Sequence, residues 1–298
     1  MLWAEEGMEK ELGNPCPANS MEWSLRSMKE IRALEGKIDF SERHPLHVLV
    51  DSDRQRVASS CVVSHVWTGR FPPGSLYRLG HGTLIASPGF CCLLVAGRHS
   101  LARTACVEME CLGLYGRVPT SRGFLDREPL LSKESLGTYL KGATGSYGVS
   151  SARKAMRCAL ENSRSPMETK TVLMLTLPPK LGGYGLPRPK LNHTILPIPN
   201  DYPVSQYATY LVDACWEKRR VVYEFNSYSE HLSESSLDND AMKMNSLGAM
   251  GWTARVVTPA QLSGDSLDVL ARQLARALGV KARQPTPEKR DELLAELL

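Results

Sequence analysis

Two acidic residues and an amide lie within apolar sequence in the second half of the chain. Asp213 lies in LVDACW, and Glu224 and Asn226 lie in VVYEFN. A carboxylate on a buried strand is unfavourable unless it is paired, hydrogen-bonded or bound to a metal ion. Carboxylate and amide oxygens are ligands that suit Mg²⁺ or Mn²⁺. The pattern therefore predicts a divalent-cation site with Asp213 and Glu224 as ligands and Asn226 beside them.

A tight charged turn, EKR at residues 217–219, separates the two segments. Antiparallel pairing across this turn places Asp213 within a step or two of Glu224 on the ladder. Because side chains alternate along a strand, Glu224 and Asn226 share one face. The opposite face then carries apolar side chains, namely Val221, Tyr223 and Phe225.

Other polar residues in this region allow both a functional and a structural interpretation. Glu168 follows Ser165 and Pro166 at the start of a predicted helix, where a capping box alone would explain the acid. Asp213 could instead accept a hydrogen bond in the turn, and Asn commonly ends strands, which applies to Asn226. His231 lies in the polar stretch SEHLSESS, which is typical of a surface.

The chain divides into five predicted parts. Residues 1–40 are expected to form a weakly ordered extension, 41–145 a small α+β domain and 146–164 a connecting helix. Residues 165–262 predict helix, three strands, helix and strand, an α/β pattern. Residues 263–298 predict two helices, the first with leucines at helical spacing that suit packing or a homodimer equally: Leu267, Leu270, Leu274 and Leu278.

The helix and strand signals outside the acidic segments are weaker. Residues 44–98 alternate short strand-like runs with turns, including a hairpin around Gly80–Gly82. Residues 87–116 are continuously apolar and predict a buried helix pair, and residues 117–134 predict a loop. A helix is expected from Asp238 to Met250, and Trp252, Val256 and Val257 are expected in the core.

Composition narrows the function classes only coarsely. The 298 residues are 42% hydrophobic and 23% charged, with a net charge of +4, which permits a nucleic-acid partner without requiring one. No apolar run is long enough to span a membrane, and the acidic start lacks the apolar core of a secretory signal. None of the eight cysteines forms a C-x-x-C pair, which favours reduced thiols in a cytoplasmic protein.

Residues 165–262 resemble the very-short-patch-repair endonuclease branch of the PD-(D/E)xK superfamily and related uncharacterised bacterial domains. The resemblance rests on Glu168 on a first helix, Asp213 on one strand and Glu224 on the next. The related domains often read E-x-D-G-x-x-H, then D-x-x-R, a Leu and GW-x-V-x-x-VT. This chain matches that motif in part, with Asn226, His231, Asp240, Lys243, Leu247 and the run GWTARVVTPAQL.

This resemblance implies a restriction-endonuclease-like mixed sheet flanked by helices and a Mg²⁺-dependent DNA endonuclease. Asp213 and Glu224 would bind the metal, and Glu168 would assist from the helix. His231 would transfer a proton, while Arg220 and Lys243 would contact the DNA backbone. Asp240 and Lys243 are three residues apart and could also simply decorate the surface of a helix. Asn226 and Ser227 depart from E-x-D-G, because Asn brings no charge to a metal site.

A second resemblance covers the run from HVLV to GTLIAS, which is similar to AbiEi-type antitoxins fused to such domains. It implies a component of a type IV toxin–antitoxin or defence system, with a cognate toxin as a partner. An alternative function is therefore a non-catalytic regulator that uses a degenerate nuclease fold to bind DNA. A third alternative is a protein-interaction module for a toxin.

Overall fold

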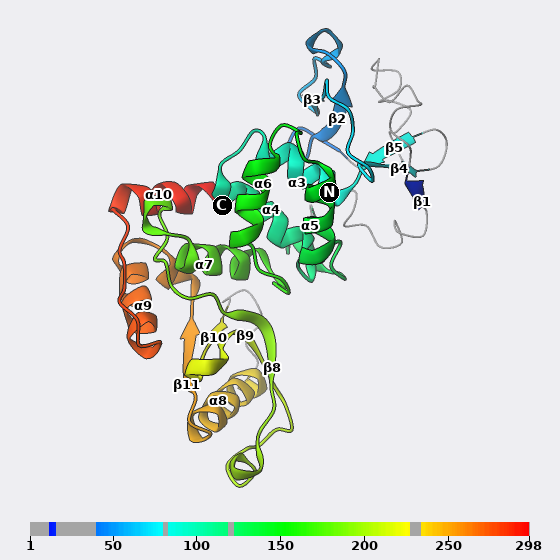
Figure 1. Cartoon of the computed structure of the whole chain (residues 1–298). Helices are drawn as coiled ribbons and strands as arrows, with labels where there is room; N and C mark the ends of the chain where they lie inside the picture. Colours follow the sequence, from blue (N-terminus) through cyan, green and yellow to red (C-terminus); the bar gives the residue numbers. More distant parts are fainter. Residues whose placement is uncertain (1–11, 16–39, 80–82, 119–121, 227–233, 298) are drawn as a thin grey trace.

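A computed structural model describes residues 12–15, 40–79, 83–118, 122–226 and 234–297. The chain mixes helices with small β-sheets, which confirms the predicted α/β class (Figure 1). The extension predicted over residues 1–40 lies outside the described residues, apart from strand β1 (Leu12–Pro15) and Phe40.

The strands of the N-terminal half form three small sheets. Strands β2 (Leu46–Val50) and β3 (Val62–Val66) are parallel, and β4 (Leu76–Leu79) pairs antiparallel with β5 (Thr83–Ala86) and with β1. The pairing of β4 with β5 confirms the predicted hairpin, whose turn at residues 80–82 lies outside the described part. Strands β6 (Tyr115–Arg117) and β7 (Phe124–Asp126) form the third sheet.

Four helices pack together in this half of the chain: α3 (Pro88–Ala96), α4 (Leu101–Cys111), α5 (Lys133–Gly142) and α6 (Val149–Cys158). The predicted buried pair corresponds to α3 and α4, and Phe90 and Leu93 of α3 are fully buried. The loop predicted over residues 117–134 was wrong in part, because the β6–β7 hairpin extends into it. Tyr115 packs edge-on against Phe124 across that hairpin, with ring centroids 6.1 Å apart.

The second half is built on a four-stranded mixed sheet, in the spatial order β11-β10-β9-β8. Strand β9 (Tyr210–Trp216) is antiparallel to both of its neighbours, β8 (Lys190–Ile195) and β10 (Val221–Phe225), and β11 (Thr253–Val257) is parallel to β10. Helix α7 (Pro166–Thr176) precedes β8, and α8 (Glu234–Ala249) connects β10 to β11. A parallel pair needs such a crossover connection.

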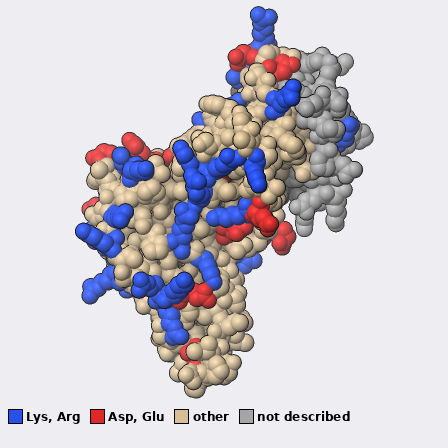
Figure 2. Space-filling view, viewed as in Figure 1, with Lys and Arg blue, Asp and Glu red and all other residues tan. Residues whose placement is uncertain are grey.

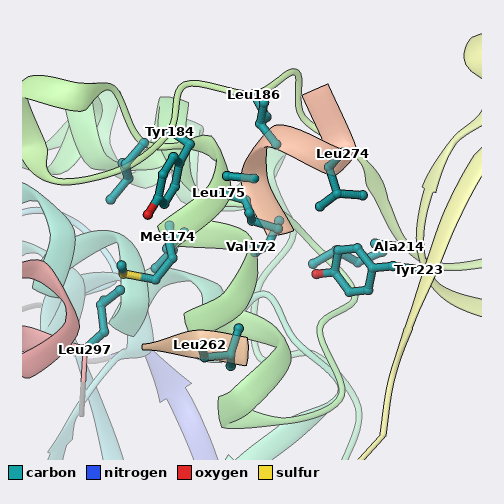
Figure 3. Packing of buried hydrophobic residues seen from close by; sticks show 14 of the residues in the cluster. Val172, Met174, Leu175, Tyr184, Leu186, Ala214, Tyr223, Leu262, Leu274 and Leu297 are labelled. Carbon is teal, nitrogen blue, oxygen red and sulfur yellow. The ribbon is translucent and has the colours of Figure 1, made fainter. Parts of the chain in front are cut away.

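Helix α7 lies in the main core, and most of its side chains are buried, including the polar ones of its first half. Val172, Leu173 and Leu175 pack with Ala214 and Tyr223 of the sheet (Figure 3). Helices α9 (Gly264–Ala277) and α10 (Pro287–Glu296) complete this core, and the leucines predicted to pack on α9 are all buried. Residues of α4 also belong to it, so one core extends across the predicted connecting segment 146–164.

Helix α8 covers the other face of the sheet. Leu247 and Met250 pack there with Tyr210, Val212 and Val222. Trp252 packs against the same cluster and Val257 is buried, as expected. The prediction for Val256 was wrong, because its side chain is 44% exposed on the edge strand β11.

Short 3-10 turns connect several elements, at Asp53–Gln55, Pro179–Leu181, Pro199–Asp201, Glu217–Arg219 and Pro259–Leu262. The turn Glu217–Arg219 joins β9 to β10, as the charged EKR segment predicted. No helix in the described part of the chain is long and apolar enough to cross a membrane. The seven described cysteines are all free thiols.

Candidate functional site

The candidate site lies where strands β9 and β10 separate. Their ladder pairs Val221 with Trp216 and ends with Tyr223 opposite Ala214. Beyond that point β10 continues beside β11, with Glu224 opposite Val256. The antiparallel pairing predicted across the turn is therefore confirmed, and it brings Asp213 and Glu224 to the place where the two strands diverge.

The Asp213 side chain bridges the two strands at this fork. Its Oδ2 accepts a hydrogen bond from the backbone N–H of Phe225 at 2.6 Å. The carboxylate thus satisfies a main-chain donor of β10 just beyond the last ladder pair. Burial raises the pKa of Asp213, while this hydrogen bond and the nearby charges of Lys243 and Arg164 act in the opposite direction.

Glu224 makes an ion pair with Lys243 of helix α8. The Lys243 Nζ lies 2.9 Å from Glu224 Oε1, and the two side chains are only 23% and 20% exposed. Burial raises the pKa of Glu224 to about 7, with a further upward contribution from Asp213 and a downward one from Lys243. The predicted acid is therefore at the fork, and Lys243 joins it there.

Glu168 is both a helix cap and a neighbour of Asp213. Its backbone N–H donates to the Ser165 Oγ at 3.1 Å, as the capping pattern predicted. Its carboxylate accepts from the Arg164 backbone N–H at 2.9 Å and from the Ser165 hydroxyl at 3.1 Å. In a regular capping box the Glu168 carboxylate would accept from the backbone N–H of the N-cap residue Ser165. Here it accepts from the N–H of Arg164, one residue earlier. Burial, then the Asp213 charge, raises the pKa of Glu168 to about 7.

Asn192 of β8 also contacts this acid, although its sequence position did not predict a role. Its Nδ2 donates to Glu168 Oε2 and to the carbonyl of Asn162, at 2.8 Å in each case. Asn192 has a φ of 44°, in the left-handed region. The one sequence signal is its place within the strand-like run LNHTI, because Asn is depleted in strands.

The Tyr223 hydroxyl is a further buried group on which the charges of the acids act. The side chain is fully buried, and its oxygen has no hydrogen-bond partner among the described residues. Figure 3 shows the hydroxyl turned toward the helix that carries Val172 and Leu175. Burial raises the pKa of this phenol well above its usual value, and the charges of Asp213 and Glu168 contribute in the same direction.

The other predicted residues have different placements. Asn226 extends the β10–β11 pairing through its backbone N–H, which donates to the Val257 carbonyl at 2.8 Å. Arg220 is at the far end of β10 from Glu224, about 13 Å away at 3.3 Å per residue. There its guanidinium donates to the Met250 carbonyl at 3.1 Å, so Arg220 joins β10 to the end of α8 at the opposite end of the strand from the fork. His231 and Ser227 lie outside the described residues.

The carboxylates at the fork meet part of what a hard cation requires. No three or more His, Cys, Asp or Glu side chains group together as a metal-binding set within the described ranges. Mg²⁺, however, is commonly held by one or two carboxylates, with water and substrate phosphate completing its shell. Asp213 and Glu224 fit that second type of site, with exposed Asp240 one helical turn before Lys243.

The surface around the core is rich in basic side chains. Figure 2 shows Lys and Arg spread over the middle of the viewed face, where Asp and Glu are fewer. Near the fork, Arg164 is exposed and its charge acts on Asp213. Basic side chains of this kind are suited to contact phosphate groups.

Comparisons of the chain with protein-family models, with curated proteins and with solved structures gave no match.

Proposed function

We propose that this protein is a Mg²⁺- or Mn²⁺-dependent phosphodiester hydrolase that cleaves DNA at the β9–β10 fork. The observation that carries the proposal is the convergence of Asp213, Glu224 and Lys243. They come from β9, β10 and α8, and they meet where the sheet opens. A buried pair of carboxylates with a lysine in contact is costly to maintain in a protein that does not use it.

The arrangement of the second half supports this proposal. The mixed sheet has α7 on one face and α8 on the other, in the chain order α7-β8-β9-β10-α8-β11. That order agrees with the restriction-endonuclease-like sheet that the PD-(D/E)xK resemblance implies. Asp213 lies on β9 and Glu224 on β10, which supports the proposal.

The chemistry divides among the residues at the fork. Asp213 and Glu224 would hold the cation, which when bound would lower the pKa of a water and stabilise charge on the reacting phosphate. Glu168 would assist from the start of α7, as a ligand or through water. Lys243 lowers the pKa of Glu224 against the effect of burial and would place a positive charge beside the reacting phosphate. This role differs from the DNA-backbone contact expected from sequence, because Lys243 is held against Glu224. His231 remains a predicted proton-transfer group.

DNA is the substrate class that the charge distribution favours. The chain has a net charge of +4, and exposed Arg164 lies beside the acids that would bind the cation. Lys and Arg contacts to phosphates supply most of the sequence-independent affinity of DNA-binding proteins. We expect these contacts in the cytoplasm, in a defence or toxin–antitoxin setting.

Cleavage of supercoiled plasmid by the purified protein with Mn²⁺ or Mg²⁺ tests the proposal. The wild-type protein should nick the plasmid, and chelation with EDTA should stop it. Glu224→Gln should lose activity by about 10²-fold or more, since one charged ligand is removed with little change in shape. A Glu224→Gln protein that nicks as fast as wild type would rule out this site.

A second function is favoured by one observation. Glu224 is already paired with Lys243, and no three-ligand metal set occurs in the described residues, as expected of a decayed site. In this alternative the protein is an AbiEi-like regulator that binds DNA or a cognate toxin, as a monomer or homodimer. It predicts salt-sensitive DNA binding that persists in Asp213→Asn and Glu224→Gln variants and no metal-dependent cleavage.

A further inference from the structure

Two of the three non-glycine residues with positive φ in the described part of the chain contact each other beside the candidate site. Asn162 has a φ of 68° and Asn192 a φ of 44°. Asn tolerates the left-handed region better than most residues, but the conformation is still uncommon inside a strand. Such backbone conformations often occur where function requires a particular geometry.

The left-handed conformation of Asn192 changes which way β8 faces. Leu191 packs in the core that contains α7, whereas Ile195 packs in the cluster beneath α8. These two residues are four apart and would share a face in a regular strand. The strand therefore changes face at Asn192, which lies between Leu191 and His193 in the pairing of β8 with β9.

The side-chain NH2 group of Asn192 makes two hydrogen bonds at this change of face. Both of its N–H groups find acceptors, one on the Asn162 carbonyl and one on Glu168 Oε2. The same Glu168 oxygen accepts from the Arg164 backbone N–H. The Glu168 carboxylate therefore accepts hydrogen bonds both from β8 and from the residue just before the cap of α7. The Asp213 charge acts on the same carboxylate.

We propose that Asn192 is a positioning residue for the site: its side-chain amide, presented by the left-handed backbone, holds the Glu168 carboxylate in place beside Asp213. This inference rests on the proposed phosphodiester hydrolysis and deepens it. It assigns a role to β8, which carries no acid of the site. A role through Glu168 also explains why a strained conformation is kept in the interior of a strand.

Two substitutions at Asn192 separate the effect of losing the side-chain amide from the effect of backbone strain. Asn192→Gly removes the amide and suits a positive φ, whereas Asn192→Ala removes the amide and adds strain. Both should lower kcat of metal-dependent cleavage, on the order of 10²-fold, with little change in KM. Only Asn192→Ala should also lower Tm markedly. Asn162→Gly is the matched control, because it keeps the main-chain carbonyl and should retain wild-type kcat.

A double-mutant cycle with Glu168→Gln tests whether Asn192 acts through Glu168. Adding Asn192→Gly to Glu168→Gln should lower kcat by less than about twofold, because the group being positioned has already been altered. A residue needed only for folding would reduce kcat by the same factor in both backgrounds. Equal factors, or an Asn192→Gly protein as active as wild type, would overturn the inference while leaving the hydrolase intact. An inactive wild-type protein would overturn both.

Discussion

The Lys243 ammonium lies 2.9 Å from a Glu224 carboxylate oxygen, and this pair joins helix α8 to strand β10. The crossover from β10 through α8 to β11 brings the two residues together. Lys243 therefore contributes a positive charge at the β9–β10 fork, where Asp213 and Glu224 contribute carboxylates.

Replacing Lys243 with Met removes the charge and keeps most of the side-chain length. We expect DNA cleavage to fall by about 10²-fold, since a positive charge near the reacting phosphate is lost. Lys243→Arg should retain part of the activity, because the charge remains. Lys218→Met, on the exposed β9–β10 turn, is the control and should cleave normally. Cleavage by Lys243→Met at the wild-type rate would exclude a role for this charge.

Asp213 also has a structural function that can be measured separately. Its Oδ2 accepts from the Phe225 N–H, so Asp213→Ala leaves a part-buried donor without its acceptor. We expect a loss of about 1–3 kcal/mol in the free energy of unfolding. Asp213→Asn keeps an acceptor oxygen and should lose less. Urea denaturation compares the variants, and equal loss in both would show that the hydrogen bond does not stabilise the fork.

The burial of Glu108 on α4, outside the candidate site, predicts that the free energy of unfolding depends on pH. Both carboxylate oxygens are buried and have no hydrogen-bond partner among the described residues. Burial, then the neighbouring Cys111, raises the pKa of Glu108 to about 9 from 4.5. The folded state holds the proton in this range while the unfolded state has lost it. Stability should therefore fall as pH rises from 4.5 toward 9.

The Glu108→Gln variant isolates this contribution. Between about pH 5 and 8, the free energy of unfolding of the wild type should fall more steeply than that of Glu108→Gln, by about 1.4 kcal/mol per pH unit. Urea denaturation at several pH values gives both slopes. Parallel slopes for the two proteins would mean that Glu108 ionises normally in the folded state.

The contact between Gly182 and α10 predicts a large effect from a single methyl group. Gly182 has a φ of 89°, and an added Cβ would lie 2.2 Å from the Lys289 carbonyl oxygen. Gly182→Ala should therefore displace α10 and lower Tm by several degrees, an effect of about 1–3 kcal/mol. Gly185→Ala is the control, since it shares a positive φ but its nearest neighbour is 3.4 Å away. Similar Tm values for the two variants would contradict the clash.

The sequence predicted those parts of the site that depend on local pattern. The antiparallel pairing of β9 with β10 follows from a short turn between alternating segments, and the start of α7 follows from Ser165 and Pro166. Asn192 could not be predicted, because its left-handed backbone and its contact with a residue 24 positions away leave no periodic signal. The contact of Lys243 likewise depends on where the crossover places α8.

One further difference has a physical cause of the same kind. Val256 was expected in the core because it is apolar, but β11 is an edge strand and the Val256 side chain is 44% exposed. Apolarity alone did not determine the position of this side chain. Arg220 remains a predicted contact for the DNA backbone, and its guanidinium binds the carbonyl of Met250.

The most direct test of the proposed hydrolysis is the single-turnover rate of plasmid cleavage with Mn²⁺ by Asp213→Asn, compared with wild type. Asp265→Asn, an exposed acid on α9, is the matched control for loss of one carboxylate. Cleavage by wild type and Asp265→Asn, with a rate for Asp213→Asn lower by about 10²-fold or more, is the predicted result. Equal rates for all three proteins, or no cleavage by any, would contradict the assignment of the fork as a phosphodiester hydrolase site.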